Sequence, residues 1–329
     1  MASGTMATLQ QPTLSDVLAA RERIKDIIRP TPLLRHPLLV QETGLDLWVK
    51  HENHNPTSAF KLRGGLNLIR SLNDADRQRG VVTASTGNHG QSIAMACQLE
   101  EVRCTVFVPD GNNPDKNAAM RAMGAMLEEG GRDFDEARER CERVAAETGA
   151  RYVHSANEPL LIAGVATYAL EIFDQLPDVE VILVPLGGGS GACGNCIVRT
   201  ARGAATRVIA VQAANADAFA RSWRSGQRIE GESAATFAEG MATRVTFDLT
   251  FEILGRELDD VVTLSEEELA EGVRLAMRTT HNLAEGAGGA ALAAAAKLKA
   301  DLTAKKVVCV MSGGNLDAAK LRWVLRQPG

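Results

Sequence analysis

Apolar and polar positions along the chain follow two periods, one typical of buried strands and one of amphipathic helices. One helix is predicted directly after Lys61, where apolar residues recur at helical spacing at Leu66, Leu68, Ile69 and Leu72. Repeated strand–helix alternation is typical of an α/β protein with mostly parallel sheets flanked by helices. The predicted strands are 45–50, 81–83, 104–108, 179–185, 208–211, 261–264 and 307–310. The other predicted helices are 14–28, 90–99, 115–123, 134–147, 160–173, 265–278, 287–298 and 316–325.

The length of the chain suggests two lobes. With 329 residues and 45% hydrophobic content it can bury a large core. Because no linker rich in proline or serine divides it, we expect the chain to leave one lobe, build a second and return. The expected large domain comprises residues 1–70 and 158–329, and the small domain comprises residues 71–157.

The net charge limits the possible partners of the protein, and the cysteine content indicates its cellular compartment. A formal net charge of -5 and a pI near 5.8 argue against nucleic acid or an anionic membrane as the main partner. We see no apolar run long enough to span a bilayer, and residues 1–11 lack the order of a signal peptide. Six unclustered cysteines are typical of a reducing compartment, so we expect a cytoplasmic protein.

The segment 55–65 contains a lysine where a turn feeds a helix. Lys61 follows the strand 45–50, and Phe60 and Leu62 flank it. Partial desolvation lowers the pKa of an amine, which is what a Schiff-base lysine requires. Taken alone, such a segment is more often a surface lysine at a helix start.

A polar turn follows the strand 81–83 and opens the next helix. It consists of Ser85, Thr86, Gly87, Asn88 and His89. A strand, a turn and a helix N-terminus together direct backbone N–H groups at an anion, and a substrate carboxylate would suit them. The Asn88 side chain could add a donor to a phenolic or carbonyl oxygen. A satisfied helix cap is the alternative interpretation of this turn alone.

A second turn, rich in glycine, follows the strand 179–185. Its residues are Gly187, Gly188, Gly189, Ser190 and Gly191. Small residues let the backbone wrap tightly enough to direct its amides at one phosphate.

The segment 189–194 also matches the dinucleotide fingerprint GxGxxG, which would indicate an NAD-dependent oxidoreductase. Such a unit needs an acidic residue roughly twenty positions on, at the end of the next strand. That strand ends at Gln212. The oxidoreductase remains the alternative from a different functional class.

Two further features are less specific. Ser312 closes the last strand at the start of a glycine turn, where its hydroxyl could bond a heteroaromatic nitrogen. Cys193 and Cys196 form a CxxC pair, but no second pair completes a zinc site. We expect these thiols to pack at the start of a helix.

Together these segments resemble the pyridoxal-phosphate enzymes of the tryptophan synthase β-like fold (fold type II), in particular threonine dehydratases and serine racemases. The resemblance covers nearly the whole chain. The matching motifs are Asn-Pro-Thr-x-x-Phe-Lys-x-Arg-Gly at 55–64, Ser-x-Gly-Asn-His at 85–89, the glycine loop at 187–191 and Ser-Gly-Gly-Asn at 312–315.

The resemblance implies a role for each motif. Lys61 would carry the cofactor pyridoxal 5'-phosphate as a Schiff base, with Phe60 packed near the ring. Asn88 would bond the phenolic oxygen of the cofactor, and Ser312 would bond the pyridine nitrogen. The glycine loop at 187–191 would cradle the phosphate. Gly240 and Glu285 match further positions that line the pocket in this family, and the family's habit implies a homodimer.

The expected reaction is β-elimination, as in an ammonia-lyase. Once a substrate amine displaces Lys61, the free lysine can remove the Cα proton, since the cofactor delocalises the resulting charge. A neutral Ser312 at the ring nitrogen favours prompt loss of a β-hydroxyl, and the product hydrolyses to a 2-oxo acid and ammonia. Threonine, serine or a bulkier β-hydroxy amino acid all fit. Racemisation is the alternative on the same scaffold, with the Thr86 hydroxyl as second base.

One departure from the family concerns metal. Serine racemase-like members bind a divalent cation through a glutamate and an aspartate, and the matching positions here are Gln212 and Ala218, with Asp217 adjacent. Because a hard cation requires anionic oxygen ligands, we expect no tight metal site.

Overall fold

The computed structural model describes residues 10–327, and its strands form two separate sheets. The larger sheet has the strand order β1-β2-β10-β7-β8-β9, and the smaller has the order β5-β4-β3-β6. Neighbouring strands run parallel, except that β1 is antiparallel to β2. The strands are β1 (Leu33–Leu34), β2 (Asp46–His51), β3 (Val81–Ala84), β4 (Cys104–Val108), β5 (Met126–Glu129), β6 (Arg151–Tyr152), β7 (Val181–Pro185), β8 (Arg207–Ala213), β9 (Asp260–Leu264) and β10 (Lys306–Met311). Residues 1–9, part of the segment assessed for a signal peptide, lie outside the described range.

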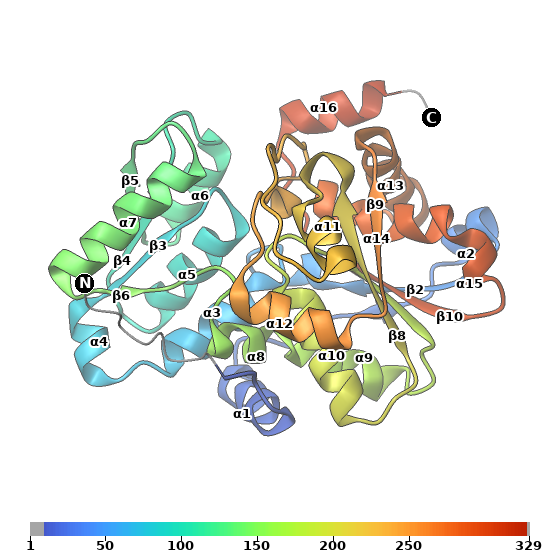
Figure 1. Cartoon of the computed structure of the whole chain (residues 1–329), viewed down its shortest axis with the longest axis horizontal. Helices are drawn as coiled ribbons and strands as arrows, with labels where there is room; N and C mark the ends of the chain where they lie inside the picture. The colour runs from blue at the N-terminus through green and yellow to red at the C-terminus, as the bar shows by residue number, and fades with distance from the viewer. Residues whose placement is uncertain (1–9, 328–329) are drawn as a thin grey trace.

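Helices flank both sheets, so the predicted α/β fold with two mostly parallel sheets is confirmed. Figure 1 shows the small sheet with α5, α6 and α7 on one side of the molecule and the large sheet on the other. The helices are α1 (Leu14–Ile24), α2 (Pro37–Thr43), α3 (Lys61–Arg70), α4 (Asp74–Arg79), α5 (Asn88–Leu99), α6 (Pro114–Ala122), α7 (Phe134–Thr148), α8 (Pro159–Val165), α9 (Thr167–Gln175), α10 (Ser190–Ala201), α11 (Ala218–Ser225), α12 (Asp248–Glu257), α13 (Glu266–Thr280), α14 (Gly286–Lys297), α15 (Lys299–Leu302) and α16 (Ala318–Arg326).

The large sheet is buried on both faces. Along β7, Ile182 and Val184 belong to the core that includes α8, α9 and α10, whereas Val181 and Leu183 belong to the core that includes α13 and α14. A parallel sheet covered on both faces needs apolar residues at consecutive positions, which explains the continuous apolar run of this strand.

Two predicted helices differ from the observed ones. The helix predicted over 14–28 ends at Ile24, and the chain then turns before Pro30. The helix predicted over 160–173 is interrupted at Ala166, which separates α8 from α9. At this point the Thr167 hydroxyl donates to the carbonyl of Gly164 at 2.7 Å, a type of bond that bends helices.

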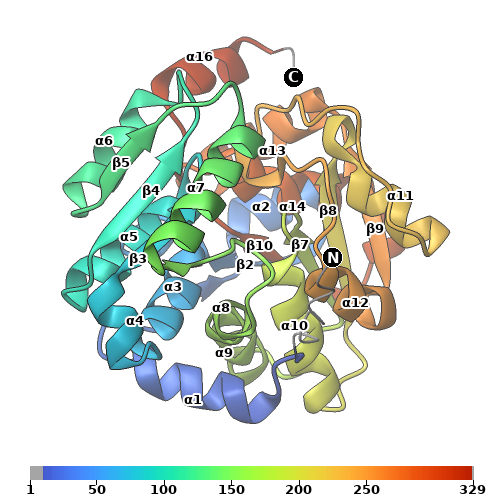
Figure 2. The same ribbon diagram turned by 60° about the vertical axis from the view of Figure 1, so that its left-hand side comes forward.

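The motif-bearing turns follow the carboxyl ends of parallel strands. The lysine segment follows β2, the asparagine turn follows β3, the glycine loop follows β7, and Ser312 follows β10 (Figure 2). In α/β proteins, ligands bind at this end of the sheet. The large sheet contributes three of these turns from distant parts of the sequence, because β10 pairs in parallel with both β2 and β7.

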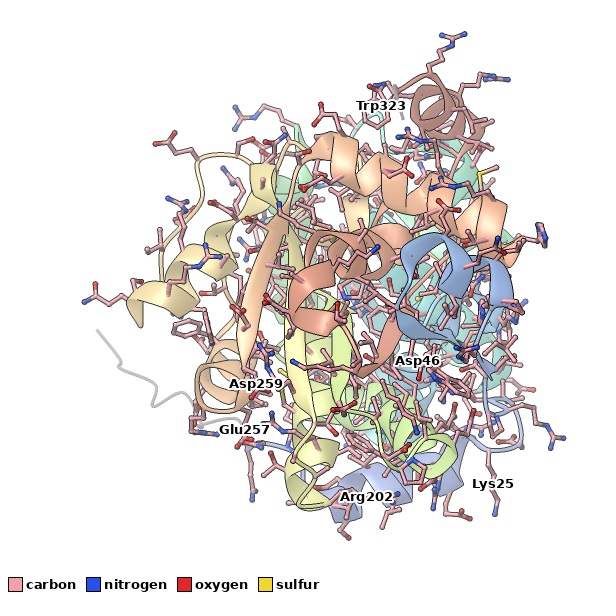
Figure 3. The ribbon with its side chains drawn as sticks, turned by 90° about the vertical axis from the view of Figure 1, so that its right-hand side faces the viewer. Lys25, Asp46, Arg202, Glu257, Asp259 and Trp323 are labelled. Carbon is pink, nitrogen blue, oxygen red and sulfur yellow. The ribbon has the colours of Figure 1, made fainter. Side chains whose placement is uncertain are left out.

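The surface mixes charges of both signs. On the face shown in Figure 3, Asp46 pairs with Arg35 at 2.6 Å and Arg202 pairs with Asp174 at 2.5 Å. Such exposed pairs contribute little to stability. Within residues 10–327, no helix is long and apolar enough to cross a membrane.

Candidate active site

Lys61 begins α3 and directs its amine at two distant segments. The Nζ atom lies 3.2 Å from the Ser190 hydroxyl of the glycine loop and 3.2 Å from the carbonyl oxygen of Ser155. It also lies 5.2 Å from the centre of the Phe60 ring. Burial lowers the pKa of the Lys61 amine to about 8. A larger fraction of the amine is therefore neutral near physiological pH, as a nucleophilic lysine requires.

The glycine loop at 187–191 presents unpaired backbone donors. Among the described residues, none accepts a hydrogen bond from the backbone N–H groups at 187–192. These groups include the first N–H groups of α10, where the helix dipole favours an anion.

The tight wrapping of this loop depends on its glycines. Gly189 has φ +94°, in the left-handed region, and a Cβ atom at Gly187 would lie 2.2 Å from the carbonyl oxygen of Gly240. The unpaired N–H groups of the loop can therefore bind a phosphate, and the neighbouring Lys61 amine can react with an aldehyde. Cys193 and Cys196, just beyond it, are buried, and their thiols contact the carbonyls of Thr250 and Glu257 in α12.

The dinucleotide interpretation of this loop lacks its second element. β8 ends with Gln212 and Ala213, and the buried Gln212 accepts a hydrogen bond from the N–H of Ala220 at 2.9 Å. No carboxylate stands at the strand end to hold a ribose.

The residues at the position of the possible cation site follow the same strand. Asp217 pairs with Arg221 at 3.0 Å. Within the described part of the chain, no group of three or more His, Cys, Asp or Glu side chains could hold a metal ion. The absence of a metal remains a prediction.

The asparagine turn at 85–89 has free donors as well as a fixed framework. The Ser85 hydroxyl accepts from the N–H groups of Gly87 at 3.1 Å and Gly90 at 2.8 Å, so it shapes the turn. Within residues 10–327, the N–H groups of Thr86, Asn88 and His89 have no acceptor. These groups can receive a carboxylate at the N-terminus of α5.

The His89 side chain joins this turn to strand β3. Its Nε2 atom lies 2.9 Å from the Thr83 hydroxyl. Burial, aided by the charge of Lys61, lowers the pKa of His89 to about 3. The ring is therefore neutral and bonds to Thr83 of the small sheet, whereas its buried Nδ1 atom has no hydrogen-bond partner within residues 10–327.

Asn88 joins the turn to the far side of the site. Its amide donates to Glu285 at 2.6 Å and accepts from Asn315 at 2.8 Å. Burial raises the pKa of Glu285, although Lys116 and the Asn88 bond act in the opposite direction. The structure thus brings the asparagine turn into contact with Glu285, directly before α14, and with Asn315, in the turn after β10.

The turn after β10 lies beside the lysine segment. The N–H of Phe60 donates to the Ser312 carbonyl at 3.0 Å, and the N–H of Gly314 donates to the Ser58 carbonyl at 2.9 Å. Gly240 faces Glu285 as well, since a Cβ atom there would lie 3.8 Å from the Glu285 carboxylate. Contacts therefore join the lysine segment to the glycine loop and to the turn after β10, and they join that turn to the asparagine turn.

Sequence reasoning missed two residues of this site. Lys116 in α6 is buried, pairs with Glu239, and lies against Gly87 of the asparagine turn. Tyr168 in α9 donates its hydroxyl hydrogen to the Gly191 carbonyl at 3.0 Å. Neither residue carries a local motif, because each acts through a partner far away in the sequence.

Comparison with known proteins agrees with this geometry. The family model described as "Pyridoxal-phosphate dependent enzyme" matches residues 24–313. An L-threonine ammonia-lyase of Thermotoga maritima is 38% identical over 93% of this chain and 76% of its own. A beta-hydroxyaspartate dehydratase of Paracoccus denitrificans is 33% identical over 95% of this chain and 99% of its own. The processed threonine deaminase isoform 2 of Solanum lycopersicum superposes with a TM-score of 0.92 at 27% identity, covering 100% of this chain and 99% of that one. The chain belongs to the family of pyridoxal-phosphate dependent enzymes.

Proposed function

We propose that this enzyme is an ammonia-lyase that eliminates the β-hydroxyl of a small amino acid, such as threonine or serine, and releases a 2-oxo acid and ammonia. One observation carries the proposal. The Lys61 amine lies 3.2 Å from the hydroxyl of Ser190 in the glycine loop, and the backbone N–H groups at 187–192 have no partner among residues 10–327. A reactive amine beside a phosphate cradle is what a pyridoxal-phosphate enzyme requires. The identity to an L-threonine ammonia-lyase supports the choice of elimination.

Each motif has a proposed part in holding the cofactor. Lys61 would bond to its aldehyde carbon, and the N–H groups at 187–192 would bind its phosphate. Asn88 would donate to its phenolic oxygen, Ser312 would face its ring nitrogen, and Phe60, Gly240 and Glu285 would line the pocket. When bound, the cofactor supplies an electron sink that stabilises negative charge at the substrate Cα.

The protein's own groups would orient the substrate and move its protons. The free N–H groups of Thr86, Asn88 and His89 would bind the substrate carboxylate at the start of α5. A neutral Lys61 amine would take the Cα proton, which its lowered pKa permits near neutral pH. Because Ser312 is uncharged, it does not hold the ring nitrogen in its protonated form, and this favours rapid loss of the hydroxyl.

The proposal is tested by the products formed from a panel of substrates. Both enantiomers of threonine, serine, 3-hydroxyaspartate and phenylserine would be incubated with the cofactor-loaded enzyme. We expect equimolar 2-oxo acid and ammonia from at least one of them. An enzyme that interconverts enantiomers faster than it releases 2-oxo acid would be a racemase, and the proposal would fail.

We further propose a cytoplasmic homodimer in which residues 71–157 form a small domain beside residues 1–70 and 158–329. All six cysteines are free and buried, which agrees with a reducing compartment. The small sheet, β3 to β6, is built from this central segment. Sedimentation of the cofactor-loaded enzyme tests the dimer.

A further inference from the structure

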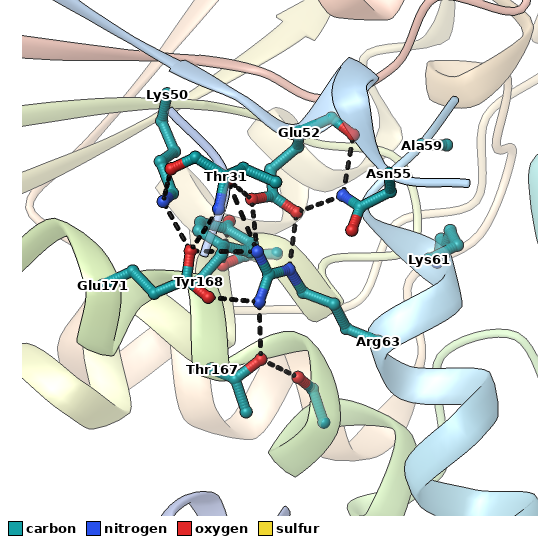
Figure 4. Close-up of polar contacts among 12 residues, drawn as sticks. Thr31, Lys50, Glu52, Asn55, Ala59, Lys61, Arg63, Thr167, Tyr168 and Glu171 are labelled. Carbon is teal, nitrogen blue, oxygen red and sulfur yellow. Dashed lines mark hydrogen bonds and ion pairs between the residues drawn. The ribbon is translucent and has the colours of Figure 1, made fainter. Parts of the chain in front are cut away.

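Helix α9 lies between the lysine helix and the glycine loop and bonds to both. Thr167 and Glu171, four residues apart, lie on the same side of the helix and reach α3. Tyr168, on a neighbouring side, reaches the start of α10. Figure 4 shows Thr167, Tyr168 and Glu171 converging with Arg63, two residues after Lys61.

The contacts with α3 pass through a buried arginine. The Arg63 guanidinium donates to the Glu171 carboxylate at 2.6 Å and 3.0 Å, and to the Thr167 hydroxyl at 3.1 Å. It also donates to both oxygens of the Glu52 carboxylate, at 2.7 Å and 2.9 Å. The Arg63 side chain is 1% exposed, so its position is fixed on every side. Because Arg63 and Lys61 share the first turn of α3, whatever fixes Arg63 also fixes the base of the lysine side chain.

Glu171 connects this arginine with the large sheet. Its carboxylate accepts from Lys50 in β2 at 2.5 Å and from the N–H of Thr31 at 3.1 Å. Lys50 and Arg63 balance Glu52 and Glu171, so the buried cluster has no formal net charge. Replacing a buried ion pair by apolar residues is often neutral or stabilising, and such pairs are weak evidence for stability. Their geometric role is therefore the informative one here.

The contacts with α10 pass through a phenol. The Tyr168 hydroxyl donates to the Gly191 carbonyl at 3.0 Å and accepts from the Asn195 amide at 2.6 Å. Its ring packs edge-on against the Phe60 ring, with 6.2 Å between the two ring centres. Tyr168 is 1% exposed, and it touches the last residue of the loop whose N–H groups are unpaired.

We propose that α9 is a spacer that fixes the distance between the Lys61 amine and the glycine loop. Its lysine end is the side of the helix where Thr167 and Glu171 contact α3, and its loop end is the side where Tyr168 contacts Gly191. This inference rests on the cofactor contacts given above for Lys61 and residues 187–191. A cofactor bound at both points has a fixed length, so the protein must hold these points at a matching separation. Thr167, Tyr168 and Glu171 are thus positioning residues, since they act on the cofactor through Arg63, Gly191 and Phe60.

The test uses small substitutions at the lysine end and at the loop end of the spacer. Tyr168→Phe removes one hydroxyl from the loop end, and Thr167→Val removes one hydroxyl from the lysine end. Glu171→Gln is a stronger change at the lysine end, and Thr167→Val keeps the test valid if that variant does not fold. The matched control is Thr206→Val. It removes a buried hydroxyl that donates to the Val179 carbonyl at 2.7 Å, a bond that involves none of the three α9 side chains.

The readout is the rate of cofactor loss from each loaded enzyme, measured as the cofactor that remains on an affinity-tagged variant recovered at intervals after mixing with excess untagged, cofactor-free parent. Thermal unfolding of the cofactor-free proteins is measured in parallel. We expect Tyr168→Phe and Thr167→Val each to speed cofactor loss about tenfold, as the loss of the bond to Gly191 or of the bond from Arg63 would do. The Tyr168→Phe, Thr167→Val double variant should lose cofactor no faster than the faster single variant, because a spacer released at one end no longer works.

Two results with the variants would overturn the inference. One is cofactor loss unchanged relative to the Thr206→Val control although unfolding temperatures fall, which would make α9 merely structural. The other is a double variant whose effect equals the product of the single effects, because the two ends would then act independently. A parent that binds no cofactor would overturn the inference together with the assignment of the cofactor site. A parent that holds cofactor but releases no 2-oxo acid would refute only the proposed function, since the spacer is judged by cofactor loss.

Discussion

Replacing Arg63 by methionine should destabilise the protein strongly, even though the new side chain is apolar and of comparable length. The substitution removes the partner of two buried carboxylates, Glu52 and Glu171, and leaves Lys50 as their nearest cation. Breaking a buried ion pair by removing one partner costs about 3–5 kcal/mol. The exposed arginine Arg202, paired with Asp174 at 2.5 Å, provides the matched control. Arg202→Met should cost less than about 1 kcal/mol.

The pH dependence of this loss follows from Glu52. Burial by itself would raise the pKa of Glu52, but the charges of Arg63 and Lys50 outweigh burial and hold the pKa below its ordinary value. In the parent, Glu52 therefore adds stability above its unfolded pKa, and this contribution is lost as the pH falls through the folded pKa. Without Arg63, burial raises the pKa of Glu52. Protonation of Glu52 on acidification then removes the unpaired buried charge that destabilises the variant. The difference between parent and variant should thus shrink as the pH falls.

Urea unfolding monitored by tryptophan fluorescence measures this difference, since Trp48 lies on β2 beside the cluster. Parent, Arg63→Met and Arg202→Met would be compared near neutral pH and at about one unit above the ordinary pKa of a glutamate. A loss below about 1 kcal/mol for Arg63→Met near neutral pH would refute the reasoning, as would a loss that grows on acidification.

Three further predictions concern the site itself. Gly187→Ala should weaken cofactor binding at least about tenfold, because its Cβ atom would lie 2.2 Å from the Gly240 carbonyl; titration of the cofactor-free protein measures this, and unchanged affinity would contradict it. Uptake of cofactor by the cofactor-free enzyme should accelerate as the pH rises through about 8, where Lys61 becomes neutral; a midpoint near the ordinary lysine value would show that the amine is not desolvated. Thr86→Ala should abolish any racemisation of serine while elimination continues, as followed by chiral chromatography; racemisation that persists would rule out the Thr86 hydroxyl as a base.

Much of the site could be predicted because its parts are local. The lysine segment, the asparagine turn, the glycine loop and Ser312 each follow an apolar strand, and the ends of parallel strands meet at one edge of a sheet. The predicted strands correspond to β2, β3, β4, β7, β8, β9 and β10, with small differences at their ends.

Other parts depend on contacts that no local pattern encodes. β5, with the sequence Met-Leu-Glu-Glu, lies at a sheet edge with most of its side chains exposed, so its sequence lacks the apolar run of a buried strand. Arg63 and Glu171 are 108 positions apart, and the interruption of the helix at Ala166 is accompanied by a bond from the Thr167 hydroxyl to the Gly164 carbonyl. Such pairings follow from the packed fold rather than from neighbouring residues.

Borohydride reduction followed by peptide mapping tests the central claim most directly. Reduction of the loaded enzyme should fix the cofactor on the peptide that contains Lys61, and Lys61→Ala should remain folded yet take up no label and release no 2-oxo acid. A label on another lysine, such as the buried Lys116, or full activity of Lys61→Ala, would contradict the account.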